Sequence, residues 1–195
     1  MVDAEYPEHA TPLDRNETEG LLLTHITSRS ELDRWEQDNI NEALAWLEKH
    51  PPKNILSESF MKRLHKKMFG NVWKWAGTFR RTDKNIGVPW YLISVELKKL
   101  CDDVAYWLEN QIFPEDETAA RFHHRLVSVH LFPNGNGRHA RLMTDILLEN
   151  QIGKPPFSWG SANLKAADMD REKYIDALIA ADQNDYEPLI RFVRS

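Results

Sequence analysis

The sequence of 195 residues has a single cysteine, Cys101. One thiol cannot form an internal disulfide or a zinc site of several thiolates, and such scarcity is usual in a reducing compartment. Cys101 stands within an apolar pattern of helical period. We therefore expect it in the core and not as a nucleophile.

The sequence also lacks the features that direct or anchor a protein to a membrane. The first residues, MVDAEYPEHATPLD, have neither the basic start nor the apolar run of a signal peptide. No apolar stretch approaches the ~20 residues of a membrane span. We expect a cytoplasmic protein without a membrane partner.

An excess of basic residues is missing as well. The formal net charge is −5, whereas a general nucleic-acid binder requires a basic face to displace counterions from phosphates. We therefore expect no nucleic-acid partner, although a local basic pocket remains compatible with this charge. With 42% hydrophobic and 28% charged residues, the composition is that of a globular protein, and the length favours one domain.

Helical periodicity dominates what the sequence does contain. Ser28 and Glu31 have the spacing of a capping box, and apolar residues then recur at helical intervals until Pro51 and Pro52. This pattern predicts an amphipathic helix with its apolar positions at Leu32, Trp35, Ala43, Leu44 and Leu47. Further stretches with helical spacing span residues 60–68, 95–108, 119–129, 142–147, 174–179 and 189–192.

An aromatic-rich segment, NVWKWAGTFRRTDKNIGVPWYLIS, separates the second and third of these helices. Gly77, Gly87 and Pro89 interrupt it, and such interruptions between apolar runs are typical of turns. We predict a loop that contains a short hairpin.

Residues 130–141, HLFPNGNGRHAR, join the fourth and fifth predicted helices through a glycine-rich turn. Such a turn leaves backbone N–H groups unpaired at a helix N-terminus, where the helix macrodipole attracts anions. Arg138 and Arg141 are three residues apart, so they share roughly one helix face and could bind two phosphate groups. His130 lies at the other lip of the turn, where an imidazole can accept a proton near neutral pH. Phe132 is expected to anchor the loop in the core.

Each of these features alone also fits a structural role. A glycine-rich connection with an arginine is commonly only a turn, and a histidine at a helix C-terminus commonly stabilises the helix dipole. The combination of a base, two amides, two glycines and two arginines in one short stretch favours a phosphate site.

The stretch from His130 to Arg141 resembles the Fic family signature, His-x-Phe-x-(Asp/Glu)-Gly-Asn-Gly-Arg-x-x-Arg, at every fixed position except Asn134. The segment WKWAGTFRRTDKNIGVPW resembles the Fic stretch that leads through a β-hairpin flap. The resemblance implies an all-α, Fic-like helical bundle with a short β-hairpin flap. Residues 20–195 would form this single domain after a partly flexible lead of residues 1–19. The wording PNGNGRHAR and TPLDRNETEGLLLTHI resembles the subgroup called mobile mystery protein B.

The resemblance implies a protein adenylyltransferase, which transfers AMP from ATP to a hydroxyl side chain of a target protein. His130 would deprotonate a Ser, Thr or Tyr of the target, whose oxygen then attacks the α-phosphate. A flap within residues 81–93 would pair with the backbone of the target. The nucleotide-binding positions would be Gly135, Asn136 and Gly137 as the anion hole, Arg138 as a phosphate contact and Arg141 as the γ-phosphate contact.

Asn134 stands where the family has an acidic residue that binds Mg²⁺ between the α- and β-phosphates. Magnesium prefers carboxylate and phosphate oxygens, and an amide oxygen brings no negative charge. We expect a weak metal site at Asn134, with slow transfer or a different nucleotide donor.

A second feature concerns inhibition. Many Fic proteins carry an inhibitory helix with the pattern (Ser/Thr)-x-x-x-Glu-(Gly/Asn), whose Glu pairs with the second arginine of the signature. Glu19 and Gly20 match its last two letters, but Arg15 stands where Ser or Thr is required. Glu19 is therefore either an inhibitory residue or an exposed residue at a turn.

Three other functions remain open at this stage. The first is a metal centre formed by several histidines. No acidic residue has a typical ligand spacing to them. A Doc-like kinase would move the γ-phosphate, yet such proteins have an Ala-Asn-Lys type of core where this sequence has GNGR. The third is a catalytically weak nucleotide-binding protein, with an antitoxin, a regulatory partner or a homo-oligomer as its interaction. Trp159 is expected to pack, with a nucleotide-base pocket as the alternative. The histidines of such a metal centre would be His123, His124, His130 and His139.

Overall fold

A computed structural model describes residues 14–160 and 167–195. Over these ranges the chain is helical, as expected, and its β pairing is limited to an isolated bridge between Leu21 and Trp73. No helix in the described ranges is long and apolar enough to cross a membrane. The elements are α1 (Arg15–Thr18), α2 (Arg29–Lys49), α3 (Glu58–Phe69), the 3₁₀ turn η1 (Trp90–Leu92), α4 (Ile93–Asn110), α5 (Glu115–Val129), α6 (Asn136–Leu147), the π-helical turn η2 (Leu148–Ile152), α7 (Ala167–Asp182) and α8 (Glu187–Val193).

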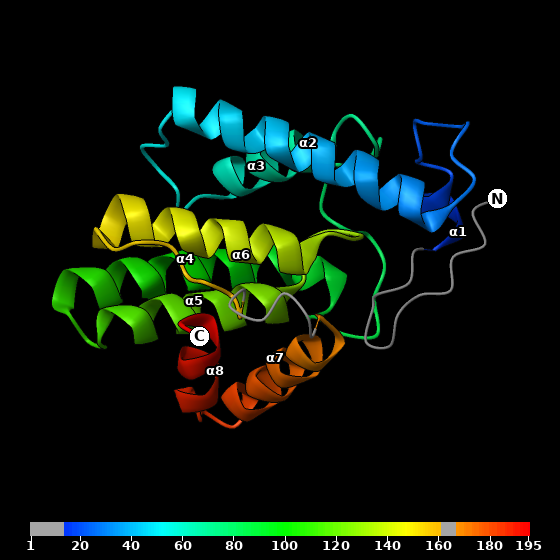
Figure 1. Ribbon diagram of the computed structural model, residues 1–195. Coiled ribbons are helices and arrows are strands. Elements are labelled where there is room, and N and C mark those ends of the chain that lie inside the picture. The colour runs from blue at the N-terminus through cyan, green and yellow to red at the C-terminus, as the bar shows by residue number, and fades with distance from the viewer. Residues whose placement is uncertain (1–13, 161–166) are drawn as a thin grey trace.

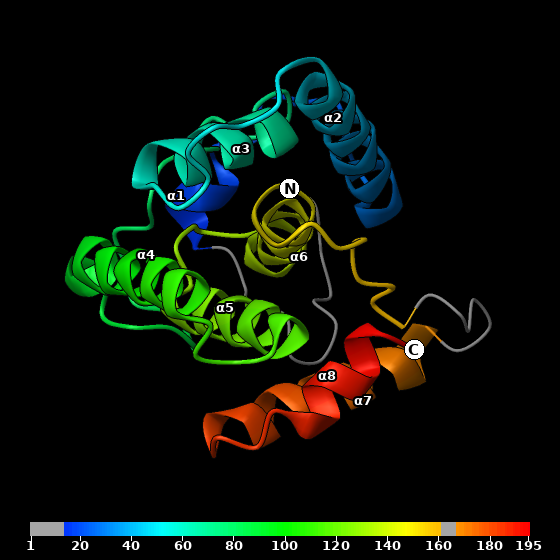
Figure 2. The ribbon, with the colours of Figure 1, turned by 90° about the vertical axis from the view of Figure 1, so that its left-hand side faces the viewer.

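Helix α6 occupies the middle of the molecule. Figure 1 shows α2 with α3 on one side of it and α7 with α8 on the other, and Figure 2, which looks along α6, places α4 and α5 beside it. The contacts between elements agree with these views, since α6 touches both α3 and α5. Helix α6 therefore lies between the other helices and packs against α3 and α5.

Helix α2 begins as the sequence predicted. The Ser28 hydroxyl accepts the Glu31 N–H at 3.3 Å, and the Glu31 carboxylate accepts the Ser28 N–H at 3.3 Å, which completes the capping box. Its inner face, however, differs from the predicted one, because Trp35 and Leu44 are 40% and 41% exposed. The buried positions of the helix are Leu32, Glu36, Asn39, Ile40 and Ala43.

Asn39 explains part of this difference. Its amide donates to the Lys67 carbonyl at 2.9 Å and accepts the Asn71 N–H at 2.9 Å. A buried polar side chain with its hydrogen bonds made is not costly, so α2 can face α3 with an amide. The pair α2–α3 is thereby fixed by directional bonds as well as by apolar packing.

Apolar residues form two clusters around α6. The larger lies between α2, α3, α4, α5 and α6 and includes Cys101 and Phe132, so both residues lie in the core as predicted. Burial raises the pKa of the Cys101 thiol to about 11, which leaves it unreactive. The smaller cluster joins α7 and α8 to η2 and the start of α5.

The loop between α3 and η1 does not form the hairpin that the sequence predicted. Residues 71–89 take turns and bends, and none of them belongs to a paired strand. Gly77 (φ 78°) and Gly87 (φ 110°) have left-handed backbone angles that reverse the chain. The buried guanidinium of Arg80 donates to the carbonyls of Thr82 and Val88. A side chain thus closes this loop in place of a ladder of backbone bonds.

Buried neutral histidines make the fold sensitive to acid. Burial lowers the pKa of His123 to about 3 and of His139 to about 4, and it lowers the pKa of His65 well below its ordinary value. The unfolded chain binds these protons near pH 6.5, so the free energy of unfolding falls as the pH drops from about 6.5 toward 4, by about 1.4 kcal/mol per pH unit for each histidine.

We expect the urea midpoint of unfolding to fall as the pH drops over this window. His139→Gln should reduce the slope by about one proton, and the exposed His50→Gln should leave it unchanged; equal slopes in both variants would contradict this account.

Candidate functional site

The turn that starts α6 requires the glycine at position 135. Gly135 is the N-cap of α6 with φ 77°, and a Cβ there would lie 2.7 Å from the Phe69 ring. The first helical bond runs from the His139 N–H to the Gly135 carbonyl, which leaves the N–H groups of residues 136–138 unused by the helix. A Cβ on Gly137 would meet no atom within 4 Å. The start of α6 thus has free N–H groups beneath open space, as an anion site requires.

Asn136 contributes to this site through its backbone. Its side-chain oxygen accepts the Phe132 N–H at 2.8 Å, and its side-chain nitrogen donates to the Phe132 carbonyl at 2.7 Å. The side chain is 7% exposed and closes the loop from inside. The side chain of Asn136 is therefore occupied within the loop, and the group that this residue can offer to an anion is its backbone N–H.

His65 supports the same loop from α3, and no pattern in the sequence indicated this role. Its Nδ1 accepts the Gly77 N–H at 3.0 Å, so the neutral ring carries its hydrogen on Nε2 and donates it to the Asn134 carbonyl at 3.1 Å. The ring also stacks on Phe132 with 3.7 Å between centroids. One side chain thus fixes the phosphate-loop candidate to both α3 and the loop at Gly77.

His130 ends α5 in a left-handed conformation, with φ 56°. It is 4% exposed, and its pKa is lowered to about 4 because burial and the charges of Arg80 and Lys84 disfavour the cation. The imidazole is therefore neutral at pH 7 and can accept a proton, although it is a weaker base than a free histidine.

Arg80 holds the backbone at His130. Its Nε donates to the His130 carbonyl at 2.6 Å, while its other nitrogens bind loop carbonyls. Gly87 approaches the same place, since a Cβ there would lie 2.7 Å from both the His130 Cβ and the Arg80 guanidinium. The loop therefore packs directly against the candidate base. Sequence reasoning missed Arg80, because nothing distinguishes it from the neighbouring Arg81.

The two signature arginines lean toward different helices. Arg138 lies over the Phe69 ring at 4.8 Å and pairs with Glu36 of α2 at 2.5 Å. Arg141 lies over the Tyr174 ring of α7 at 4.7 Å, and its Nε is buried without a hydrogen-bond acceptor among the described residues. Arg138 and Arg141 occupy successive turns of α6. The Arg138 guanidinium therefore lies on the α2 side of the helix and the Arg141 guanidinium on the α7 side.

Trp159 is packed, as expected. Its indole N–H donates to the Asp145 carboxylate at 3.0 Å, and its ring lies 4.6 Å from that of His123. Burial raises the pKa of Asp145 to about 6. The Arg141 guanidinium lies 5.8 Å from the Trp159 ring, which makes this tryptophan a neighbour of the site.

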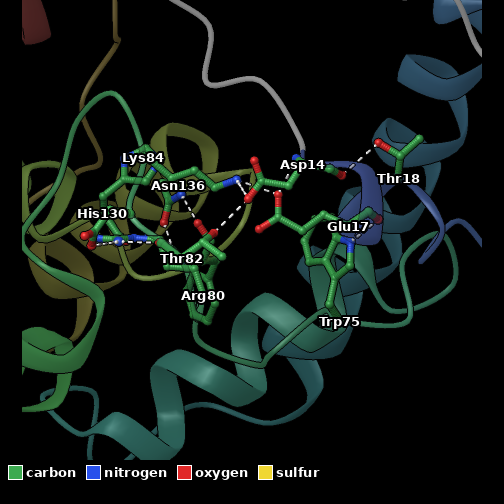
Figure 3. A network of polar contacts seen from close by, with 11 residues as sticks. Asp14, Glu17, Thr18, Trp75, Arg80, Thr82, Lys84, His130 and Asn136 are labelled. Carbon is green, nitrogen blue, oxygen red and sulfur yellow. Dashed lines mark hydrogen bonds and ion pairs between the residues drawn. The ribbon is translucent and has the colours of Figure 1, made fainter.

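The N-terminal segment reaches the loop near His130 (Figure 3). The Lys84 ammonium, whose side chain is 3% exposed, binds Asp14 at 2.9 Å and Glu17 at 2.5 Å. Asp14 also accepts the Thr82 hydroxyl at 2.8 Å. Glu19 is exposed in the turn after α1, and the carboxylates of Asp14 and Glu17 contact this loop. Of the expected lead, residues 1–13 lie outside the described residues.

The residues around Asn134 do not fit a protein-bound magnesium ion. The Asn134 side-chain oxygen accepts the Gly135 N–H at 2.7 Å, so this oxygen already has a hydrogen-bond donor. Within residues 14–160 and 167–195, no group of three His, Cys, Asp or Glu side chains is placed to hold a metal. The histidines near the site have separate partners: His123 binds Tyr174, His124 binds Asp182, and His139 binds the Met61 carbonyl.

The titration of His130 can be measured without any substrate. We expect its imidazole to titrate near pH 4 in an NMR experiment. Lys84→Met should raise this pKa by part of the shift, because it removes one positive charge while burial and Arg80 remain. Lys98→Met is the matched control, since Lys98 is exposed on α4 and pairs with Asp102. A His130 pKa near 6.5 in the unaltered protein would show that burial and the neighbouring charges do not disfavour the imidazolium in the way described.

Known proteins resemble this chain in sequence. The sequence model of the Fic/DOC family matches residues 55–148. The protein adenylyltransferase Fic of Aedes aegypti is 31% identical over 134 residues, which are 67% of this chain and 25% of that protein. The Nematostella vectensis protein of the same name is 31% identical over 67% of this chain and 30% of its own length. The chain thus spans less than a third of these curated relatives.

Solved structures resemble it in fold. Fic-1 from C. elegans has a TM-score of 0.61 and 28% identity over 80% of this chain and 45% of that one. BepC, a VirB-translocated effector of Bartonella tribocorum with bound AMPPNP, has a TM-score of 0.69 and 18% identity over 93% of this chain and 97% of that one. With this signature, this order of helices around α6 and these relatives, the chain belongs to the Fic/DOC family.

Proposed function

We propose that this protein transfers AMP from ATP to a hydroxyl side chain of a target protein. The observation that carries the proposal is the position of His130, a neutral buried imidazole in the loop that leads into the open N-terminus of α6. A base beside an anion site is the minimum that transfer of a nucleotidyl group to a hydroxyl requires. The curated relatives are named protein adenylyltransferases, which supports the same reaction.

In the proposed reaction, His130 accepts the proton of the target hydroxyl, and the hydroxyl oxygen bonds to the α-phosphorus of ATP. The bond between that phosphorus and the bridging oxygen to the β-phosphate breaks, and pyrophosphate leaves. The N–H groups of residues 136–138 stabilise the charge on the phosphate oxygens. Arg138 contacts the same phosphates and Arg141 the γ-phosphate. The chain therefore acts by positioning and by charge, with no covalent intermediate.

The loop of residues 81–93 is the proposed contact for the target. Trp90 and Tyr91 are 45% and 66% exposed there, although large aromatic side chains are usually buried. Its backbone is not paired in strands, so it can offer N–H and carbonyl groups to an extended segment. Arg80 and Gly87 connect this loop to His130, which would bring a bound hydroxyl to the base.

Magnesium enters this proposal as part of the nucleotide, because Mg²⁺ commonly keeps phosphate and water ligands. Asn134 offers one amide oxygen that already accepts a backbone N–H, so no step depends on metal held by the protein. The inhibitory role of Glu19 stays a prediction, as do an antitoxin, a regulatory partner and a homo-oligomer.

The decisive experiment supplies ATP labelled at either the α- or the γ-phosphate and follows label on protein. We expect α-label alone, and its loss in His130→Ala, because the base is removed. His50→Ala is the matched control, since His50 is exposed at the end of α2. Transfer of γ-label alone would replace the proposal by a kinase. ATP binding without transfer, in the presence of candidate targets, would leave a nucleotide-binding interaction protein.

Asn134→Asp tests the metal requirement. A carboxylate there adds a negative charge that Mg²⁺ prefers, so we expect AMP transfer to rise about tenfold and to depend more steeply on the Mg²⁺ concentration. The measurement is the rate of α-label transfer over a Mg²⁺ titration. Asn150→Asp, at an exposed position in η2, controls for added charge. No increase at any Mg²⁺ concentration would contradict the expected weakness at Asn134.

A further inference from the structure

Glu36 of α2 is a buried carboxylate that reaches the site from outside residues 55–148. It is 3% exposed and lies on the inner stripe of α2 with Leu32 and Ile40, one helical turn from each. A buried carboxylate is costly unless its charge is paired and its oxygens are hydrogen-bonded. Its partners are therefore informative about why an acid occupies this position.

Both oxygens of Glu36 accept hydrogen bonds from donors. Its Oε1 accepts the Trp73 indole N–H at 2.5 Å, and its Oε2 accepts Nη1 of Arg138 at 2.5 Å. An indole N–H and a guanidinium can only donate, so two acceptors are required. A carboxylate supplies both, whereas an amide at this position would leave one donor facing its own N–H group.

The rest of the Arg138 guanidinium is partly exposed and lies against one aromatic ring. Its guanidinium lies over the Phe69 ring at 4.8 Å, and its side chain is 36% exposed. Within the described residues, no acceptor other than Glu36 binds it. One edge of the guanidinium is thus fixed by Glu36 and one face by Phe69, while the remaining donors are left for a phosphate at the start of α6.

We propose that Glu36 is a positioning residue that fixes the Arg138 guanidinium for the phosphates of the bound nucleotide. The proposal rests on the function proposed above for the same site. Holding the side chain in place removes its freedom before the nucleotide arrives, so less conformational entropy is lost on binding. Trp73 in turn fixes the carboxylate, which makes the arrangement rigid.

The test compares Glu36→Gln with Glu42→Gln. Glu42 is the matched control, because it lies on the same helix and accepts a side-chain bond, from Asn71 at 2.8 Å, but contacts no site arginine. We expect the Kd for ATP to rise about tenfold in Glu36→Gln and to stay unchanged in Glu42→Gln. Tighter binding or greater labelling in Glu36→Gln would overturn the proposal, because Glu36 would then restrain Arg138 from the nucleotide.

A double-mutant cycle separates positioning from general destabilisation. If Glu36 acts through Arg138, then Glu36→Gln should have no further effect on the Kd for ATP in an Arg138→Ala background. An equal effect in both backgrounds would overturn the proposal. Thermal unfolding of each variant identifies any that fails to fold, and Glu36→Asp, which keeps both acceptor oxygens, should bind ATP more tightly than Glu36→Gln.

An NMR measurement on the nucleotide-free protein tests whether Glu36 holds the Arg138 guanidinium in place. Rotation of the Arg138 guanidinium about its Nε–Cζ bond should be slow in the unaltered protein and in Glu42→Gln, and fast in Glu36→Gln. Fast rotation in the unaltered protein would overturn the proposal. If rotation is slow and Glu36→Gln weakens ATP binding but no AMP is transferred, Glu36 positions Arg138 and the proposed AMP transfer fails. The two ideas can therefore fail separately.

Discussion

The site depends on one constraint, the position of α6 between the other helices (Figure 2), with its first N–H groups left without helical partners. A helix start carries N–H groups without helical partners, so the surrounding residues must either satisfy them or leave them for a ligand. Asn136 closes the preceding loop from inside, and His65 fixes the Asn134 carbonyl. These bonds are made by side chains, and the N–H groups of residues 136–138 are left unused by the helix. A Cβ on Gly137 would meet no atom within 4 Å, so the space beside these N–H groups is open.

Local patterns in the sequence predicted local structure well. The capping box at Ser28 forms as expected, because it depends on residues only three apart. The inner face of α2 was predicted less well, since apolar periodicity alone selected Trp35 and Leu44, which are exposed. The stripe at positions 32, 36, 40 and 43 also has helical spacing, with an acid at its second position. A carboxylate in an otherwise apolar stripe was the available signal for Glu36.

The remaining parts of the site could not be predicted, because they depend on contacts between distant residues. A single sequence shows which side chains can donate or accept, but not which of them the fold brings together. The hairpin prediction was wrong for the same reason, since a side chain takes carbonyls that a ladder would need. The contacts concerned join His65 to Asn134, Arg80 to His130 and Glu36 to Arg138, which are 69, 50 and 102 residues apart.

Two segments ahead of residues 55–148 supply acids to the cations of the site. Asp14 and Glu17 bind Lys84 in the loop beside His130, and Glu36 binds Arg138 at the start of α6. The two pairings differ in one physical respect. In the first pairing the cation is enclosed, since the Lys84 side chain is 3% exposed. In the second the acid Glu36 is enclosed and fixed by Trp73, while the Arg138 side chain is 36% exposed. A buried ion pair is costly to break, and a partly exposed cation is reached more easily by a ligand, so a polyanionic nucleotide would reach Arg138 more easily than Lys84. Under the proposed function, Arg138 would thus bind phosphate in the position that α2 gives it, while Asp14 and Glu17 stay paired with Lys84.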